Sequence, residues 1–245
     1  MKGVLLQRVP TGTFLDISHE VQPQQIRQAG FFLSASWPYL PKGSICLAVV
    51  DPGVGTDRRM LCLQKQDRIV LAPDNGLVSQ LLASPGDSRI VDITPNWSGP
   101  QASATFHGRD LFAPLAADLA LGAQVEALGR ELDPNELRHL ELSSAIQSGS
   151  EITARVVHVD RFGNCILNLA AGDWSARFDR LPELRLLVPQ CEPVLIVTTY
   201  ARIPEGAFGL LQGSQGFYEL ACNQASCARR LGLYIGDRVE FRLNP

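Results

Sequence analysis

The sequence lacks several features that would mark a membrane or nucleic-acid protein. No apolar run approaches the roughly 18 residues that a membrane-spanning helix needs, and residues 1–8 are too short a start for a signal peptide. There is no long basic run and the net charge is −3, which argues against a surface for nucleic acid or an anionic membrane. We therefore predict a globular, cytoplasmic protein with neither of these partners.

Metal ligands and disulfide partners are also sparse. The six cysteines and four histidines are scattered, without a Cys-x-x-Cys pair or a metal-ligand spacing. Scattered cysteines within apolar runs are typical of reduced, buried thiols and not of a zinc site or a disulfide framework. The sequence therefore predicts neither a metal nor a cofactor.

What the chain does contain is enough apolar material for a core. Of its 245 residues 45% are hydrophobic and 19% charged, which suggests one or two globular domains. In the first half strand-like and helical stretches alternate, a pattern that favours an α/β domain with a mainly parallel sheet covered on both faces. The expected strands are 13–17, 45–50, 59–64, 69–72 and 90–93, of which 59–64 and 69–72 form a hairpin-like pair, and the expected helices are 24–37, 77–82 and 111–121.

The second half has a different pattern. Strand-like runs follow one another through turns with little helix between them, which favours a small all-β domain of barrel or sandwich type. Polar residues with Asp-Pro and Ser-Gly pairs separate the two halves. We predict an α/β domain over residues 1–140, a linker over 141–150 and the all-β domain over 151–245.

The end of the expected strand 45–50 carries the most informative motif. Residues 51–56 read Asp-Pro-Gly-Val-Gly-Thr, so a glycine-broken turn stops the apolar run abruptly. Open α/β sheets place their ligand sites at the carboxyl ends of strands, which makes Asp51 a candidate site residue. The simpler alternative is an aspartate that bonds to its own turn. Arg58 and Arg59 follow closely and could each supply a guanidinium.

Two other polar motifs stand next to expected secondary structure. Residues 105–110 read Thr-Phe-His-Gly-Arg-Asp before an apolar helix, and His107 stands out there, although Asp110 could simply cap that helix. Residues 160–164 read Asp-Arg-Phe-Gly-Asn, a composition suited to a hairpin turn. An aromatic side chain at the tip of a turn predicts that a planar ligand or a neighbouring subunit covers it.

These motifs, with Pro-Asp-Asn-Gly at 73–76, resemble in content and order the S-adenosyl-L-methionine hydroxide adenosyltransferase family. Its members are S-adenosylmethionine hydrolases, relatives of the fluorinating and chlorinating enzymes. Gly-Ser-Gln-Gly at 213–216 and Ala-Cys-Asn at 221–223 extend the resemblance over nearly the whole chain. It implies an N-terminal α/β domain, a C-terminal β-barrel, and a homotrimer whose sites lie between the N-domain of one subunit and the C-domain of the next.

The resemblance also implies a reaction. Water or hydroxide attacks the ribose C5′ of S-adenosylmethionine without a metal, giving adenosine and L-methionine. The Asp-Arg-His set of the hydrolases, which the halogenating relatives lack, falls on Asp51, Arg58 and His107. A neutral thioether leaves, so the difficulty lies in positioning a weakly nucleophilic water. Because a carboxylate beside an arginine is a weak base, we expect the trio to orient the water together.

Substrate-binding positions are implied in the same way. Asp160 is expected to pair with the methionine ammonium and Ser214 to meet its carboxylate. Phe162 and Asn164 are expected to shape the adenine end, whose edge is read by backbone at two further positions. The full implied set is Asp160, Phe162, Asn164, Ser214, Asn223 and Gln224.

The resemblance has one departure at the start of the sequence. Family members normally carry a strand and turn reading Thr-Asp-Phe-Gly before the Met-Lys-Gly-Val that here is residues 1–4. We therefore expect the first strand of the sheet and a ribose-binding aspartate to be missing. Either the natural protein starts earlier and is active, or this form is a weakened or non-catalytic protein that binds S-adenosylmethionine or adenosine. A halide-dependent adenosyl transferase is a third hypothesis.

Overall fold

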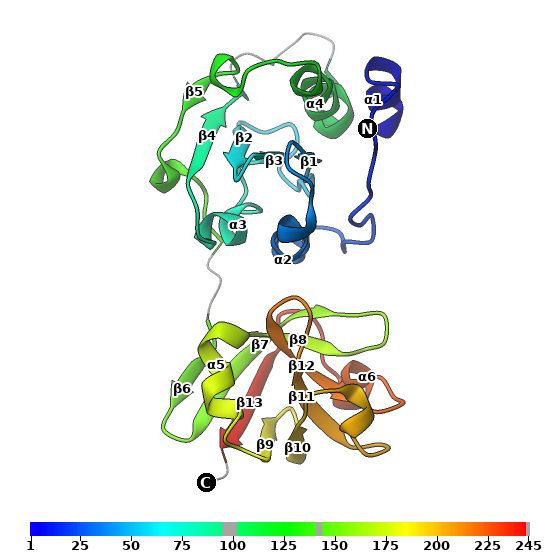
Figure 1. Ribbon diagram of the computed structural model, residues 1–245, viewed down its shortest axis with the longest axis vertical. Coiled ribbons are helices and arrows are strands. Elements are labelled where there is room, and N and C mark those ends of the chain that lie inside the picture. Colours follow the sequence, from blue (N-terminus) through cyan, green and yellow to red (C-terminus); the bar gives the residue numbers. More distant parts are fainter. Residues whose placement is uncertain (95–101, 141–143, 244–245) are drawn as a thin grey trace. The chain divides into compact units, whose positions relative to one another are not determined.

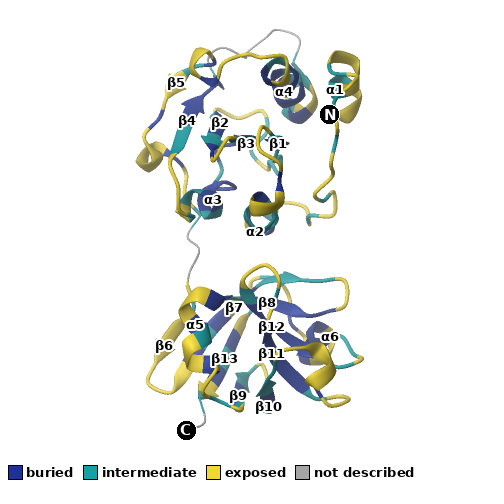
Figure 2. Ribbon diagram, in the orientation of Figure 1, coloured by how far each residue is buried: buried dark blue, intermediate teal, exposed yellow. Residues whose placement is uncertain are grey.

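The computed structural model describes residues 1–94, 102–140 and 144–243. The chain forms two compact units, Met1–Glu141 and Leu142–Pro245 (Figure 1). Each unit has its own hydrophobic core, and Figure 2 shows many of the buried residues on the strands and on α4 (Ala113–Ala120), whereas α1 (Lys2–Arg8) carries none. In these described ranges, no helix combines the length and the apolar character needed to cross a membrane.

A five-stranded sheet in the order β1-β3-β2-β4-β5 forms the centre of the first unit. Only the β1–β3 pairing of these described strands is parallel, so the expected mainly parallel sheet is wrong and the sheet is mixed. The reason is local: β2 and β3 are joined by a two-residue turn, and so short a connection permits only antiparallel pairing. The strands are β1 (Ile45–Leu47), β2 (Met60–Lys65), β3 (Arg68–Pro73), β4 (Ser88–Asp92) and β5 (Arg130–Glu131).

Helices cover both faces of this sheet, as expected. Alternate residues of β2 belong to two cores: Leu61 and Leu63 pack on the side of α2 and α3, whereas Met60 and Cys62 pack on the side of α4. The helical segments are α1 (Lys2–Arg8), α2 (Ile26–Ser36), η1 (Trp37–Tyr39), α3 (Ser79–Ala83), the π-helical turn η3 (Gly108–Phe112), α4 (Ala113–Ala120), η4 (Val125–Ala127) and η5 (Pro134–Glu136).

One expected strand does not form. Residues 13–17 are irregular, and within them Leu15 is 73% exposed. Without a neighbouring strand to pair with, their apolar composition is insufficient to make a strand.

The second unit is a closed barrel, which confirms the expected barrel. Seven described strands run in the order β13-β9-β10-β11-β12-β8-β7, and β13 pairs with β7 to close the ring. Its interior is filled by the alternate side chains of the strands. The elements are β7 (Glu151–Val159), β8 (Cys165–Ala170), α5 (Ala171–Phe178), β9 (Glu183–Val188), β10 (Glu192–Ile196), η6 (Tyr200–Arg202), β11 (Phe208–Gln212), β12 (Phe217–Cys222), α6 (Cys227–Leu231) and β13 (Arg238–Leu243).

The predicted linker is partly structured. Ile146–Ser148 forms an additional strand, β6, antiparallel to the start of β7, while residues 141–143 lie outside the described residues.

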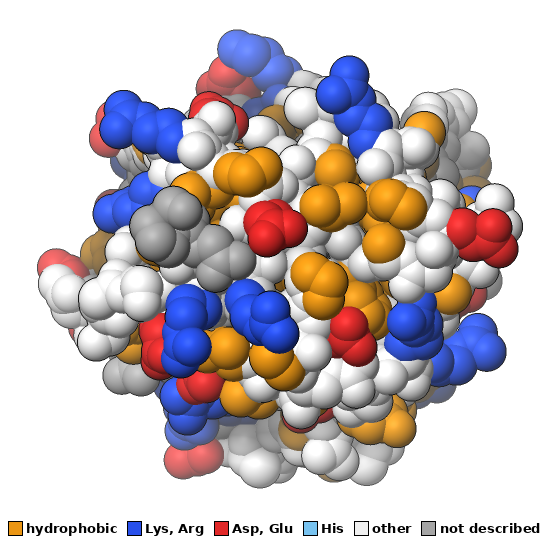
Figure 3. All heavy atoms as spheres, turned by 90° about the horizontal axis from the view of Figure 1, so that it is seen from below, with side chains coloured by type: hydrophobic (Ala, Val, Ile, Leu, Met, Phe, Trp, Pro, Cys, Tyr) orange, Lys and Arg blue, Asp and Glu red, His pale blue; other side chains and the backbone are white. Residues whose placement is uncertain are grey.

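On the face of the molecule drawn in Figure 3, basic and acidic side chains are interspersed among apolar ones, so that neither sign of charge forms a continuous surface there.

Candidate active site

The turn after β1 brings two distant segments together. The chain still follows β3 beyond β1, since Ala48 N–H donates to the Leu71 carbonyl at 3.0 Å, and it then turns back through residues 51–56. Gly55 has a φ of +80°, and a Cβ there would collide with the carbonyl oxygen of Ala104. Glycine is therefore required both by the backbone conformation and by the close approach of the segment that leads to His107.

Asp51, Arg58 and His107 meet at this turn, with the guanidinium in the centre. Arg58 Nε donates to Asp51 Oδ1 at 2.8 Å and Oδ2 at 2.9 Å, and Nη2 also contacts Oδ2. The same Nη2 lies 3.0 Å from His107 Nδ1. The side chains of Arg58 and Asp51 are only 3% and 5% exposed, so this ion pair is shielded from water. The structure thus brings together all three residues of the predicted catalytic set.

The contact with Arg58 decides which nitrogen of the neutral His107 ring carries its proton. A guanidinium can only donate, so Nδ1 accepts and the proton is on Nε2. Burial lowers the pKa of His107 and the Arg58 charge lowers it further, while Asp51 and Asp110 oppose both effects. His107 is therefore neutral at pH 7 and offers an Nε2–H donor on the side away from Arg58.

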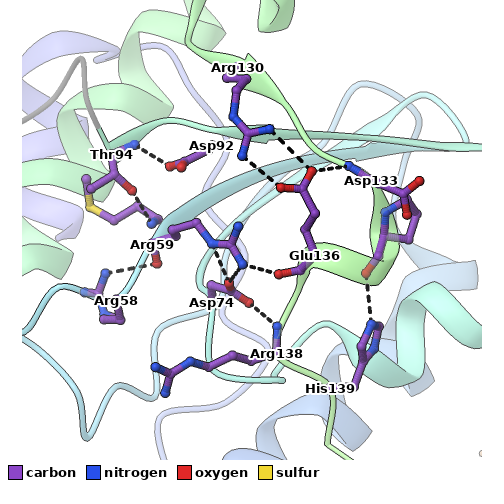
Figure 4. Close-up of polar contacts among 12 residues, drawn as sticks. Arg58, Arg59, Asp74, Asp92, Thr94, Arg130, Asp133, Glu136, Arg138 and His139 are labelled. Carbon is purple, nitrogen blue, oxygen red and sulfur yellow. Dashed lines mark hydrogen bonds and ion pairs between the residues drawn. The ribbon is translucent and has the colours of Figure 1, made fainter.

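The neighbouring arginine points elsewhere. Arg59 Nε donates to Asp74 Oδ2 at 2.9 Å (Figure 4), whereas the hydrogen bonds to Asp51 come from Arg58. Geometry therefore selects Arg58, and not Arg59, as the partner of Asp51.

Asp110 is tied into its own loop instead of capping a helix. It accepts a hydrogen bond from Arg109 Nε at 2.5 Å and one from Ser103 N–H at 2.9 Å, and these bonds lower the pKa of Asp110 to about 2. Its carboxylate therefore holds the loop that carries His107.

In the second unit, Asp160 closes the turn between β7 and β8. Its Oδ1 accepts from the N–H groups of Phe162 and Asn164, both at 2.9 Å, and its Oδ2 accepts from Asn164 Nδ2 at 2.9 Å. The simpler structural role foreseen for this motif is therefore present. Phe162 is nevertheless 65% exposed, with the Arg161 guanidinium 4.8 Å from its ring centre. The turn presents an aromatic face that its own unit does not bury.

The turn also lies against the segment after β12. Gly163 has a φ of +86°, and a Cβ there would collide with the Ser226 hydroxyl, while its carbonyl accepts from Ala228 N–H at 2.9 Å. Asn223 Nδ2 donates to the Ile203 carbonyl at 2.6 Å, and Gln224 is exposed with a φ of 56°.

Ser214 stands apart from the other predicted binding residues. It is exposed in the turn that precedes β12, whereas Asn223 and Gln224 follow that strand. The structure thus places five of the six predicted binding residues around one end of β12 and the sixth at its other end.

Sequence reasoning missed one buried acid in this unit. Glu219 is 3% exposed and accepts a hydrogen bond from the Tyr200 hydroxyl. Burial raises the pKa of Glu219, the Tyr200 bond opposes this, and the charge of Asp160 raises it again. A glutamate within the apolar run 217–222 was the available signal.

Two models of known protein families match this chain. The family model described as SAM hydroxide adenosyltransferase N-terminal domain matches residues 1–129, and the one for the C-terminal domain matches residues 154–240. The chain belongs to this family. The family predicted from the motifs is thereby confirmed.

Individual relatives agree with this assignment. The chain is 38% identical over 240 residues to the (R)-S-adenosyl-L-methionine hydrolase of Salinispora tropica, covering 97% of this chain and 89% of that protein. The hydrolase of the same name from Thermus thermophilus is 38% identical over 251 residues, with 98% and 92% coverage. A fluorinase of Nocardia brasiliensis is 24% identical, with 99% and 91% coverage. An uncharacterized conserved protein from Thermotoga maritima superposes with a TM-score of 0.90 at 28% identity, covering 98% and 93% of the two chains.

Proposed function

We propose that this protein hydrolyses S-adenosyl-L-methionine to adenosine and L-methionine. The observation that carries the proposal is the buried Asp51–Arg58–His107 trio, in which one guanidinium bridges a carboxylate and an imidazole. Four relatives named (R)-S-adenosyl-L-methionine hydrolase, between 28% and 38% identical over most of the chain, support it.

The reaction forms a bond from the water oxygen to C5′ and breaks the bond from C5′ to sulfur. The electron pair of the broken bond neutralises the sulfonium, so the methionine thioether leaves without a proton. The water oxygen must be held in line with the breaking bond, and its hydroxide-like charge must be stabilised as one of its protons passes to bulk solvent. The Nε2–H of His107 and the guanidinium of Arg58 are suited to this task.

Asp51 has a supporting role in this scheme. Both of its oxygens already accept hydrogen bonds from Arg58, so it is poorly placed to take a proton from water by itself. Its carboxylate instead holds the guanidinium in one orientation and compensates its buried charge.

The binding groups complete the proposal. Asp160 would pair with the ammonium of methionine through Oδ2, because this oxygen accepts one hydrogen bond within the turn and keeps a second lone pair, whereas Oδ1 accepts two. The exposed ring of Phe162, with Asn164 and the backbone around Asn223 and Gln224, would hold adenine, and Ser214 would meet the methionine carboxylate. A cytoplasmic homotrimer, with sites at subunit interfaces, would cover the exposed aromatic surface.

The test is to incubate the purified protein with S-adenosylmethionine and follow adenosine and methionine by chromatography. We expect equal amounts of both products, and loss of both in His107→Ala. 5′-Chloro-5′-deoxyadenosine formed with added chloride would favour the halide-dependent transferase instead. Calorimetric binding without products, unchanged in His107→Ala, would replace hydrolysis with a binding function.

A further inference from the structure

The loop after β3 holds the backbone on both sides of the Asp51–Arg58 segment. Asn75 Nδ2 donates to the carbonyl of Val50 at 2.9 Å, directly before Asp51. The N–H of Asp74 donates to the carbonyl of Arg59 at 2.9 Å, directly after Arg58. Two adjacent residues of one loop therefore fix the two ends of the segment that carries the carboxylate and the guanidinium.

Asp74 is the more fully engaged of these two residues. Its side chain is only 2% exposed. Oδ2 accepts from Arg59 Nε at 2.9 Å and lies 2.9 Å from Nη2, while Oδ1 accepts from the N–H of Arg138 at 2.9 Å (Figure 4). A buried carboxylate with both oxygens bonded to fixed donors is rigid, and removing its charge would leave the guanidinium uncompensated.

The link to the trio runs through one carbonyl. The Arg59 oxygen accepts from Asp74 N–H and is also 3.4 Å from Arg58 Nη1. The Arg58 guanidinium thus has Asp51 and His107 on one side and this carbonyl on its remaining nitrogen. Asp74 therefore holds that carbonyl in two ways. Its N–H donates directly to the carbonyl oxygen, and its carboxylate holds the side chain of the same residue, Arg59.

We propose that Asp74 is a positioning residue for the water-orienting trio, acting through Arg59 to hold Arg58 in register with Asp51 and His107. This inference deepens the proposed function. Its prediction for kcat rests on the hydrolysis of S-adenosylmethionine proposed above. A purely structural role would also be served by these bonds, because Asp74 and Arg59 additionally anchor the backbone at Glu136 and Arg138. The experiment must therefore separate the two roles.

The variant Asp74→Asn keeps an acceptor for Arg138 N–H but loses the charge that faces Arg59. Asp92→Asn is a matched control, since Asp92 is also buried at a strand end of the same sheet and bonds Thr94 N–H at 3.0 Å instead of an arginine. We expect kcat to fall about tenfold to a hundredfold in Asp74→Asn while KM for S-adenosylmethionine stays within about twofold. Equal losses of kcat in both variants, or a raised KM at unchanged kcat, would overturn the positioning role.

A double-mutant cycle tests the route through Arg59. If Asp74 acts through it, Arg59→Gln alone should reproduce the loss of kcat, and the double variant should lose no more than either single one. Additive losses would contradict this route.

A second readout does not depend on turnover. Burial lowers the pKa of His107, and among the charges that face its ring Arg58 lowers it further while Asp51 and Asp110 raise it. If Asp74→Asn releases Arg58, the pKa of His107 should rise toward its ordinary value, whereas Asp92→Asn should leave it unchanged. NMR titration of the His107 ring, assigned with His107→Gln, measures this.

The two proposals can fail separately. Suppose that Asp74→Asn shifts the pKa of His107 but the wild-type protein does not hydrolyse S-adenosylmethionine. This result would support the positioning role of Asp74 and refute the proposed function. If the wild-type protein is active and Asp74→Asn changes neither kcat nor the pKa of His107, the proposed function stands and the positioning role is refuted.

Discussion

Replacing Gly55 by alanine tests the close approach that brings His107 to Arg58. Two costs add up at this position. A left-handed residue with a side chain is strained by about 1 to 2 kcal/mol, and displacing the backbone that the new Cβ meets adds about 1 to 3 kcal/mol. The obstacle is the carbonyl of Ala104, which a rotamer change cannot remove.

Gly43 offers a matched control in the same unit. Its φ of +78° is almost that of Gly55, but nothing lies within 4 Å of the position that a Cβ would take. Gly43→Ala should therefore carry the strain alone. Calorimetric unfolding should place the first unit's transition about 2 to 12 °C lower in Gly55→Ala than in Gly43→Ala.

Activity gives the second half of this test. Below both transitions, Gly55→Ala should also lose about tenfold or more in kcat, because the segment that carries His107 has to move. Gly43→Ala should keep the wild-type kcat. Equal unfolding temperatures in the two variants would refute the close approach, and an unchanged kcat in Gly55→Ala would refute its link to the site.

Three other predictions address the charges and the aromatic surface. Arg58→Lys keeps the charge but loses the fork between Asp51 and His107, so kcat should fall about a hundredfold or more with little change in KM, measured by steady-state kinetics. Phe162→Ala should raise KM for S-adenosylmethionine with little change in unfolding temperature, because the ring is 65% exposed. The raised pKa of Glu219 contributes stability that is complete below the unfolded pKa of about 4.5 and is lost as pH rises through the folded value. Glu219→Gln should therefore unfold at a higher temperature than wild type at pH 7 and at a similar one at pH 4, and an equal gain at both pH values would contradict this assignment.

The topology of the first sheet shows where pattern reasoning reached its limit. Alternating strands and helices correctly indicated a sheet with helices on both faces. The hairpin-like pair 59–64 and 69–72 is confirmed as β2 and β3, joined by a two-residue turn at Gln66 and Asp67, both with positive φ. The pattern did not reveal that β2 also pairs antiparallel with β4, because that pairing joins segments whose order in the sheet no local pattern specifies. The expected strand 13–17 failed for the related reason that a strand needs a partner, and no residue pattern within 13–17 supplies one.

The charged groups of the second unit show a similar limit. Asp160, Phe162 and Asn164 were identified from one short motif, and one turn indeed holds all three. Glu219 was not predicted as a notable residue, because a single acid in an apolar strand does not indicate which group it will bond. Only the fold brings the Tyr200 hydroxyl within hydrogen-bonding distance of it.

The sequence by itself determined the family, the division into an α/β half and an all-β half, and the residue types at the candidate site. Those follow from local order along the chain: motif spacing, strand and helix periodicity, and turn composition. What only the tertiary structure decided is the choice between two adjacent arginines. Successive side chains of an extended chain point to opposite sides, so Arg58 turns to Asp51 and His107 while Arg59 turns to Asp74. The partners come from segments 7, 49 and 15 residues away, and only the packed sheet brings them within hydrogen-bonding distance.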